Sequence, residues 1–249
     1  MSAPTSTGTW LRRFRPTAGA PVRLVCFPHA GGSASYFVPV ARAHAPGVDV
    51  LAVQYPGRQD RRAEPAVDSI PELVDALVPE LLAWTGEPFA FFGHSMGATV
   101  AFEVARRLEE RGVTPVHLFA SARRGPTTHR GERLHLRGDR VLMEELRSLG
   151  GTDLRAMDDE ILAMVLPALR ADYKAVETYE HVPGPPLRTP ITALIGDGDP
   201  KVSEDEARTW AEHTAGGFEL EVFRGGHFYL TDHAEAVNAL IADRLRRAR

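Results

Sequence analysis

The sequence predicts an α/β domain built on a doubly wound, mostly parallel sheet. Short apolar runs alternate with amphipathic helical patterns along the chain, which is the βαβ rhythm of parallel sheets. Most of these runs are continuously apolar, as strands covered by helices on both faces require. The 249 residues allow one large domain or two small ones. Because no linker or repeat divides the chain, we expect a single domain over residues 1–249.

Six segments have the composition of strands. They are residues 22–27, 48–55, 89–92, 116–120, 191–196 and 218–223. The last of them, FELEVF, alternates apolar and charged side chains, so we expect it at an edge of the sheet.

Helical patterns fill most of the intervals between these strands. They cover residues 71–84, the segment ATVAFEVARRLEERG that Gly112 ends, the segment ARTWAEHT and residues 234–247. Ser69 is a candidate N-cap for the first of these helices. Ser203, with Glu206 three residues later, predicts a capping box before ARTWAEHT.

One long segment interrupts the alternation. Residues 125–186 contain helical patterns such as VLMEELRSLG and no good strand. About 60 residues between two strands is longer than an ordinary crossover connection. We therefore expect a helical lid over the carboxyl edge of the sheet, more mobile over residues 134–179 than the sheet itself.

Composition excludes several classes of protein. The net charge of −4 argues against binding nucleic acid through its phosphates. Neither a signal peptide nor an apolar run long enough to span a membrane is present, so we expect a cytoplasmic protein. The single cysteine, Cys26, excludes disulfides and cysteine-based metal sites; it lies in a predicted buried strand, where we expect it to be inert.

The motif Gly93-His94-Ser95-Met96-Gly97 carries the chemistry. It follows the apolar run PFAFF and begins a predicted helix, the context of a G-x-S-x-G nucleophile elbow. The glycines allow the strained turn and the close packing around it. Ser95 is therefore the candidate nucleophile.

An elbow of this kind is followed along the chain by an acid and then by a histidine. His227 lies in the loop after FELEVF and is the candidate base. Asp197 and Asp199 both lie in the loop after residues 191–196. Asp199 is favoured because it lies deeper in that loop, whereas Asp197, beside Gly198, also fits a local turn.

The glycine-rich segment Pro28-His29-Ala30-Gly31-Gly32 follows the first predicted strand. An oxyanion donor belongs in such a turn, so the backbone N–H groups of Ala30 and Met96 are the candidate oxyanion hole. His29 is expected to shape the turn rather than act as the base. The remaining histidines show no metal-ligand spacing, and no metal or other cofactor is expected.

These motifs together resemble a known family. FPHAGG, QYPGRQDRRAEP, FFGHSMGA, GDGDPKV and GGHFYL occur in the order found in the stand-alone type II thioesterases, which proofread polyketide synthases and non-ribosomal peptide synthetases. The resemblance runs from TWLRRF to the last helix. It implies an α/β-hydrolase fold with a helical lid, a triad of Ser95, Asp199 and His227, and an oxyanion hole at Ala30 and Met96. It also favours Asp199 over Asp197, because the family's acid precedes a proline.

The same resemblance implies hydrolysis of acyl groups from the phosphopantetheine arm of an acyl or peptidyl carrier protein. Carrier proteins are typically acidic, and 27 of the 29 basic residues are arginines. Coding bias is the favoured interpretation of this excess. The functional hypothesis is an arginine rim that attracts the carrier, with Arg58, Arg61, Arg62, Arg123 and Arg124 as its candidates.

Three other functions are compatible with the motifs. A general carboxylesterase or lipase-like serine hydrolase would use the same triad without a carrier partner. A product-releasing thioesterase would transfer the acyl group to an internal nucleophile. A catalytically dead hydrolase scaffold would serve for binding only, and a fluorophosphonate probe that failed to label Ser95 would support it.

Overall fold

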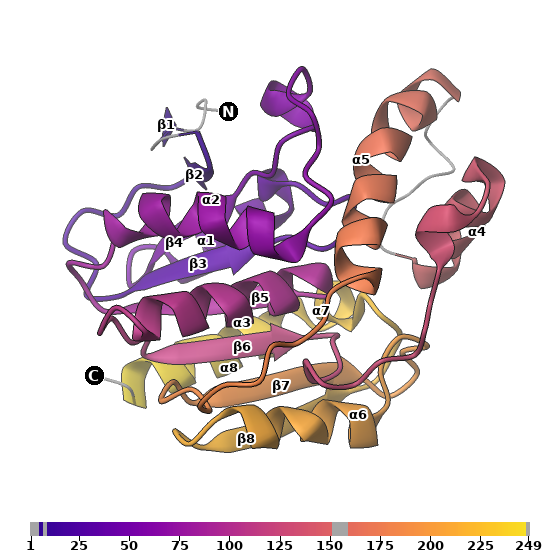
Figure 1. The fold of residues 1–249 in the computed structure, drawn as a ribbon. Helices are drawn as coiled ribbons and strands as arrows, with labels where there is room; N and C mark the ends of the chain where they lie inside the picture. The colour runs from indigo at the N-terminus through magenta and orange to yellow at the C-terminus, as the bar shows by residue number, and fades with distance from the viewer. Residues whose placement is uncertain (1–4, 7–8, 151–158, 248–249) are drawn as a thin grey trace.

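The computed structural model describes residues 5–6, 9–150 and 159–247. Within them, eight strands form one sheet in the order β1-β2-β4-β3-β5-β6-β7-β8 (Figure 1). The strands from β4 to β8 in that order are parallel, whereas β2 is antiparallel to β4 and β1 to β2. Their bounds are β1 Thr5–Ser6, β2 Leu11–Arg13, β3 Arg23–Phe27, β4 Asp49–Val53, β5 Phe89–His94, β6 His117–Ser121, β7 Ile191–Gly196 and β8 Phe218–Phe223.

All six predicted strands are present, and β8 lies at an edge as expected. Strands β1 and β2 were not predicted. The three residues of β2 include two arginines, so the strand lacks the apolar run that marks the others. The guanidinium groups are neutralised by distant carboxylates, Arg12 by Asp60 and Arg13 by Asp49. These ion pairs allow a charged segment to close that side of the sheet.

Helices cover both faces of the sheet (Figure 1). The α-helices are α1 Val38–His44, α2 Ile70–Leu82, α3 Met96–Glu109, α4 Asp139–Leu149, α5 Asp159–Glu177, α6 Glu204–Arg208, α7 Tyr229–Asp232 and α8 Ala234–Arg247. Short 3₁₀ helices are η1 Ala34–Phe37, η2 Gln59–Arg61, η3 Leu134–Leu136 and η5 Thr209–His213. No helix in the described part of the chain is long and apolar enough to cross a membrane.

Side chains alternate along each strand and so divide the core in two. On β3, Val25 and Phe27 pack into the core beneath α2 and α3. Leu24 and Cys26 point to the opposite face, where α1 and α8 cover them. Burial raises the pKa of the Cys26 thiol, which fits an inert core residue.

The predicted helix starts are confirmed by their caps. The Ser69 hydroxyl accepts a hydrogen bond from the N–H of Glu72 at the start of α2. Ser203 and Glu206 form the complete capping box before α6. Each cap satisfies backbone N–H groups that have no partner within the helix.

Between β6 and β7 the described residues form η3, α4 and α5. We call residues 125–186 the helical insertion. Figure 1 shows α4 and α5 beside the carboxyl ends of the parallel strands. A small apolar core joins these two helices and reaches Ala30; it consists of Leu142, Met143, Leu146, Leu169 and Tyr173.

Candidate active site

Ser95 lies on the sharp turn between β5 and α3. Its backbone has φ 55° and ψ −119°, a strained conformation for a residue with a side chain. A Cβ on Gly93 would lie 2.3 Å from the Gly97 carbonyl oxygen, and one on Gly97 would lie 2.0 Å from that of Phe27. Both glycines of the motif are therefore required by close backbone packing, which holds Ser95 at the start of α3.

His227 and Asp199 meet at the ends of β7 and β8. The Nδ1 atom of His227 lies 2.9 and 3.0 Å from the two Asp199 carboxylate oxygens. Both side chains are buried, and the Lys201 N–H also donates to Asp199 at 2.8 Å. With Nδ1 occupied by the carboxylate, Nε2 is the nitrogen that remains to exchange a proton with Ser95.

Asp197 lies in the same loop but has different contacts. Its exposed carboxylate accepts a hydrogen bond from the Gly225 N–H at 2.8 Å. The structure thus brings Asp199, and not Asp197, against His227. Asp197 has the local backbone contact that its position beside Gly198 suggested.

Ser95 and His227 line one small cavity together with Ala30 and Met96. Its volume is about 40 Å³, on the order of a few water molecules. No hydrogen bond joins the Ser95 hydroxyl to His227 in the described structure, and such bonds often tighten only when substrate binds. A larger hollow of about 240 Å³ beside α2 and α3 is lined by none of these four residues.

The segment 29–32 forms a tight turn beside the Ser95 elbow. The Gly32 N–H donates to the His29 carbonyl at 2.9 Å, and Gly31 has φ +75°. The N–H groups of Ala30 and Met96 donate no hydrogen bond to any part of the chain that the structure describes. Two unpaired donors beside the candidate nucleophile Ser95 are the arrangement that an oxyanion requires.

Comparison with known proteins places this geometry in a family. The thioesterase-domain family matches residues 22–245. Thioesterase PikA5 of Streptomyces venezuelae is 51% identical over 96% of this chain and 86% of its own length. The type II thioesterase BorB from the borrelidin biosynthetic cluster has a TM-score of 0.91 with 52% identity, covering 97% of this chain and 99% of its own.

A third relative is YbtT, a type II thioesterase from the yersiniabactin NRPS/PKS biosynthetic pathway. It has a TM-score of 0.84 and 34% identity, covering 94% of this chain and 96% of its own. The chain belongs to the thioesterase family. The resemblance to type II thioesterases, the α/β-hydrolase fold and the expected class of serine enzyme that hydrolyses thioesters are confirmed.

Two buried histidines of this thioesterase lie behind His227. The ring of His94 lies 5.3 Å from that of His227, and the ring of His29 lies 5.7 Å from that of His94. Burial, and then the charge of His227, lower the pKa of both, to about 3 for His29. Both rings therefore stay neutral near pH 7 and do not oppose the charge that His227 would gain. His29 also packs edge-on against Tyr36, which agrees with a structural role in the turn.

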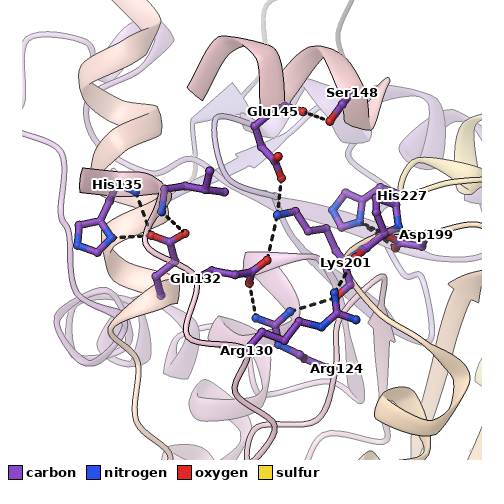
Figure 2. Close-up of polar contacts among 12 residues, drawn as sticks. Arg124, Arg130, Glu132, His135, Glu145, Ser148, Asp199, Lys201 and His227 are labelled. Atoms are coloured by element: carbon purple, nitrogen blue, oxygen red, sulfur yellow. Dashed lines mark hydrogen bonds and ion pairs between the residues drawn. The ribbon is translucent and has the colours of Figure 1, made fainter. Parts of the chain in front are cut away.

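A network of charges borders the cavity. Figure 2 shows the Lys201 ammonium between the carboxylates of Glu132 and Glu145, close to His227 and Asp199. Arg124 binds the other oxygen of Glu132 and donates to the Lys201 carbonyl at 3.1 Å. Glu145 belongs to α4, so the network connects the helical insertion to the loop that contains Asp199.

The predicted arginine rim is wrong for three of its five members. Arg58, Arg61 and Arg124 are buried and paired with the carboxylates of Asp172, Glu64 and Glu132 respectively. Arg123 is partly buried and lines the cavity, where its Nε donates to the Thr99 hydroxyl at 3.2 Å. Among the five, only Arg62 is exposed. Arginine content alone does not reveal burial, because burial depends on how the fold packs around each side chain; the partner of Arg58, for example, lies 114 residues away.

The predicted site does not include Asp172, Glu132 or Lys201. Asp172 lies in α5, and its buried partner is Arg58, 114 residues away. Lys201 had a weak signal, because it is one of only two lysines and follows Asp199 by two positions. No local pattern indicates the two glutamates that it binds.

Proposed function

We propose that this protein removes acyl groups from the phosphopantetheine arms of carrier proteins through a Ser95–His227–Asp199 triad. The observation that carries the proposal is the buried Asp199–His227 pair beside Ser95 on its strained elbow. The relatives support the assembly-line setting, since YbtT comes from an NRPS/PKS pathway and BorB from the borrelidin cluster. On this proposal the enzyme edits polyketide or non-ribosomal peptide assembly lines.

In the first half of the reaction the Ser95 oxygen attacks the thioester carbonyl. His227 Nε2 accepts the hydroxyl proton, and Asp199 at Nδ1 keeps the ring in the required tautomer and stabilises its charged form. The tetrahedral intermediate collapses when the C–S bond breaks. The pantetheine thiol leaves with the proton from His227, and the acyl group remains as an ester on Ser95.

The negative charge on the carbonyl oxygen is held by the N–H groups of Ala30 and Met96. Met96 is the first residue of α3, so the positive end of the helix dipole adds to its N–H. Neither N–H has to give up a partner in the chain when the oxyanion forms. Such prearranged donors stabilise the transition state without a reorganisation cost.

The second half of the reaction releases the product. His227 takes a proton from water, and the resulting hydroxide attacks the ester carbon. The same two N–H groups hold the second oxyanion, and the Ser95 oxygen leaves with the proton from His227. The products are a free carboxylic acid and the regenerated enzyme.

The helical insertion acts as a lid in this proposal. The cavity of about 40 Å³ is too small for an acyl pantetheine, since small-molecule sites have volumes of roughly 300–1,000 Å³. The apolar core shared by α4 and α5 extends to Ala30 and would line the acyl chamber when the insertion moves. Entry of a thioester therefore requires α4 and α5 to shift relative to the sheet.

The test compares two substrates with the same acyl group. Wild type should hydrolyse a propionyl group on phosphopantetheinylated carrier protein much faster than a matched simple propionyl ester. Ser95→Ala should abolish hydrolysis and labelling by a fluorophosphonate while the thermal midpoint is retained. Equal rates on the two substrates would support the general carboxylesterase, and turnover by Ser95→Ala would refute the triad.

A further inference from the structure

Asp172 of α5 is buried directly against the turn that contains Ala30. Only 1% of its surface is exposed. One carboxylate oxygen, Oδ2, accepts from the Gly31 N–H at 2.7 Å and from Arg58 Nη1 at 2.7 Å. The other oxygen, Oδ1, accepts from Arg58 Nη2 at 2.8 Å. A side chain of the helical insertion thus binds the backbone next to a candidate oxyanion donor.

Arg58 binds the same turn from the other side. Its Nη1 donates to the Gly32 carbonyl at 3.1 Å, and its Nε donates to the Pro56 carbonyl at 3.3 Å. Burial disfavours the charge on the guanidinium, but Asp172 outweighs this effect and raises the pKa of Arg58. The guanidinium therefore stays charged, and the pair bridges the segment after β4, the turn and α5.

Packing of α5 adds to these polar contacts. Leu169, one helical turn before Asp172, covers Gly31 so closely that a Cβ there would lie 2.9 Å from its Cδ1. Ala30 itself packs against the apolar core of the insertion. Helix α5 therefore holds the turn through both a side-chain carboxylate and an apolar contact.

These contacts restrain the peptide groups on the far side of Ala30. Before Ala30, the chain is fixed by β3, where Phe27 pairs with Gly93 of β5. After Ala30, Asp172 fixes the N–H of Gly31 and Arg58 fixes the carbonyl of Gly32. The direction of the Ala30 N–H is set between these two anchors, because each restrains the backbone dihedrals of the turn.

We propose that Asp172 and Arg58 are positioning residues that aim the Ala30 N–H at the oxyanion, so that the oxyanion hole is complete only when α5 is seated. This inference rests on the proposed function of Ser95 and Ala30. An apolar pair of similar size could seat the helix as firmly. An apolar pair could not supply the hydrogen bonds to the Gly31 N–H and the Gly32 carbonyl.

The experiment uses the full-length enzyme and four variants. Asp172→Asn keeps one acceptor oxygen but loses the charge. Arg58→Lys keeps the charge but loses the two-pronged contact. The double variant Arg58→Met with Asp172→Leu removes both charges and keeps the volume. The matched control is Asp68→Asn, which removes the exposed Lys174–Asp68 ion pair from the same helix without touching the turn.

Each protein is assayed with the propionyl thioester of N-acetylcysteamine and with a trifluoromethyl ketone, which forms a tetrahedral oxyanion on a reactive serine. Asp172→Asn and the double variant should lower kcat by roughly 10- to 100-fold, since misplacing a catalytic group by about 1 Å costs up to ~100-fold. KM should change by less than about threefold, since ground-state binding does not use the oxyanion contact. Inhibitor affinity should fall by the same factor as kcat/KM.

Arg58→Lys should lower kcat less than Asp172→Asn does, because the ammonium can still reach one oxygen of the intact Asp172 carboxylate. Asp68→Asn should match wild type in kcat and in inhibitor affinity. The thermal midpoint of the double variant should lie close to that of wild type, which separates loss of positioning from loss of folding.

Two results would overturn the inference. In the first, the double variant or Asp172→Asn binds the inhibitor and turns over substrate as wild type does; the proposed function then stands. In the second, the variants lose kcat/KM only through a higher KM, and their kcat is that of wild type. Failure of wild type itself to bind the trifluoromethyl ketone is a different result, which refutes the role of Ser95 and with it both proposals.

Discussion

Asp199→Asn should lower kcat by about a thousandfold or more, whereas Asp197→Asn should change it by less than about threefold. The two residues are neighbours in one loop and differ in what they contact. Asp199 is buried against His227, and Asp197 is exposed and binds the Gly225 N–H. Asparagine can replace Asp197 as an acceptor, so this variant is a matched control for the loop.

The magnitude follows from the distances at His227. When the ring takes the Ser95 proton it becomes a cation whose Nδ1 lies 2.9 Å from a carboxylate oxygen, with the charge centres about 4 Å apart. At an effective dielectric constant of about 20, two such charges attract by ~4 kcal/mol. At about 1.4 kcal/mol per factor of ten, this attraction corresponds to about a thousandfold in rate.

Hydrogen bonding adds to this loss. The Lys201 N–H already donates to one Asp199 oxygen at 2.8 Å, so the single oxygen of an asparagine would stay with that donor. Its NH₂ group would then face His227 Nδ1 and favour the wrong tautomer of the ring. The kcat of Asp199→Asn should therefore fall by more than the roughly thousandfold expected from charge attraction alone.

Steady-state hydrolysis of a propionyl thioester by wild type and both variants measures the effect. Thermal midpoints, measured in parallel, show whether the loop still folds. Activity of Asp199→Asn within about tenfold of wild type would refute this account of the site, as would an equal loss in Asp197→Asn.

Three further predictions concern the packing and charges around the site. Gly97→Ala should abolish activity and lower the thermal midpoint, because its Cβ would lie 2.0 Å from the Phe27 carbonyl oxygen; kinetics and thermal unfolding check both effects. Lys201→Met should speed amide hydrogen exchange in α4 but not in β5, because Lys201 binds Glu145 of α4; unchanged exchange in α4 would contradict this. Burial alone would raise the pKa of Glu132, but Arg124 and Lys201 outweigh it and lower the pKa from 4.5 to about 2. Glu132 therefore stabilises the folded state fully above pH 4.5 and loses this effect as the pH falls toward 2, so the thermal midpoints of wild type and Glu132→Gln should converge over that range.

Much of the fold could be predicted because its signals are local. A strand buried on both faces needs an unbroken apolar run, and this marked β3 to β7. Caps at Ser69 and Ser203 bind backbone only three residues away. Elements without such signals were missed, as with β2, where long-range ion pairs compensate two arginines.

The residues of the candidate site could be predicted from the sequence for a related reason. In a parallel sheet the loops after successive strands meet at one edge, so residues far apart in sequence come together there. The loops after β3, β5, β7 and β8 contain Ala30, Ser95, Asp199 and His227. The G-x-S-x-G spacing follows from backbone clearance at Gly93 and Gly97, which is also a local constraint.

The sequence by itself determined the order of strands β3 to β8 along the chain, the elbow at Ser95 and the family to which the chain belongs. Only the tertiary structure decided which carboxylate meets His227, which arginines are buried, and that Asp172 reaches Gly31 and Arg58. The physical reason is that backbone propensities and caps act over a few residues. The partner of a buried charge can come from any part of the chain that the fold brings close to it. For Arg58 that partner is 114 residues away.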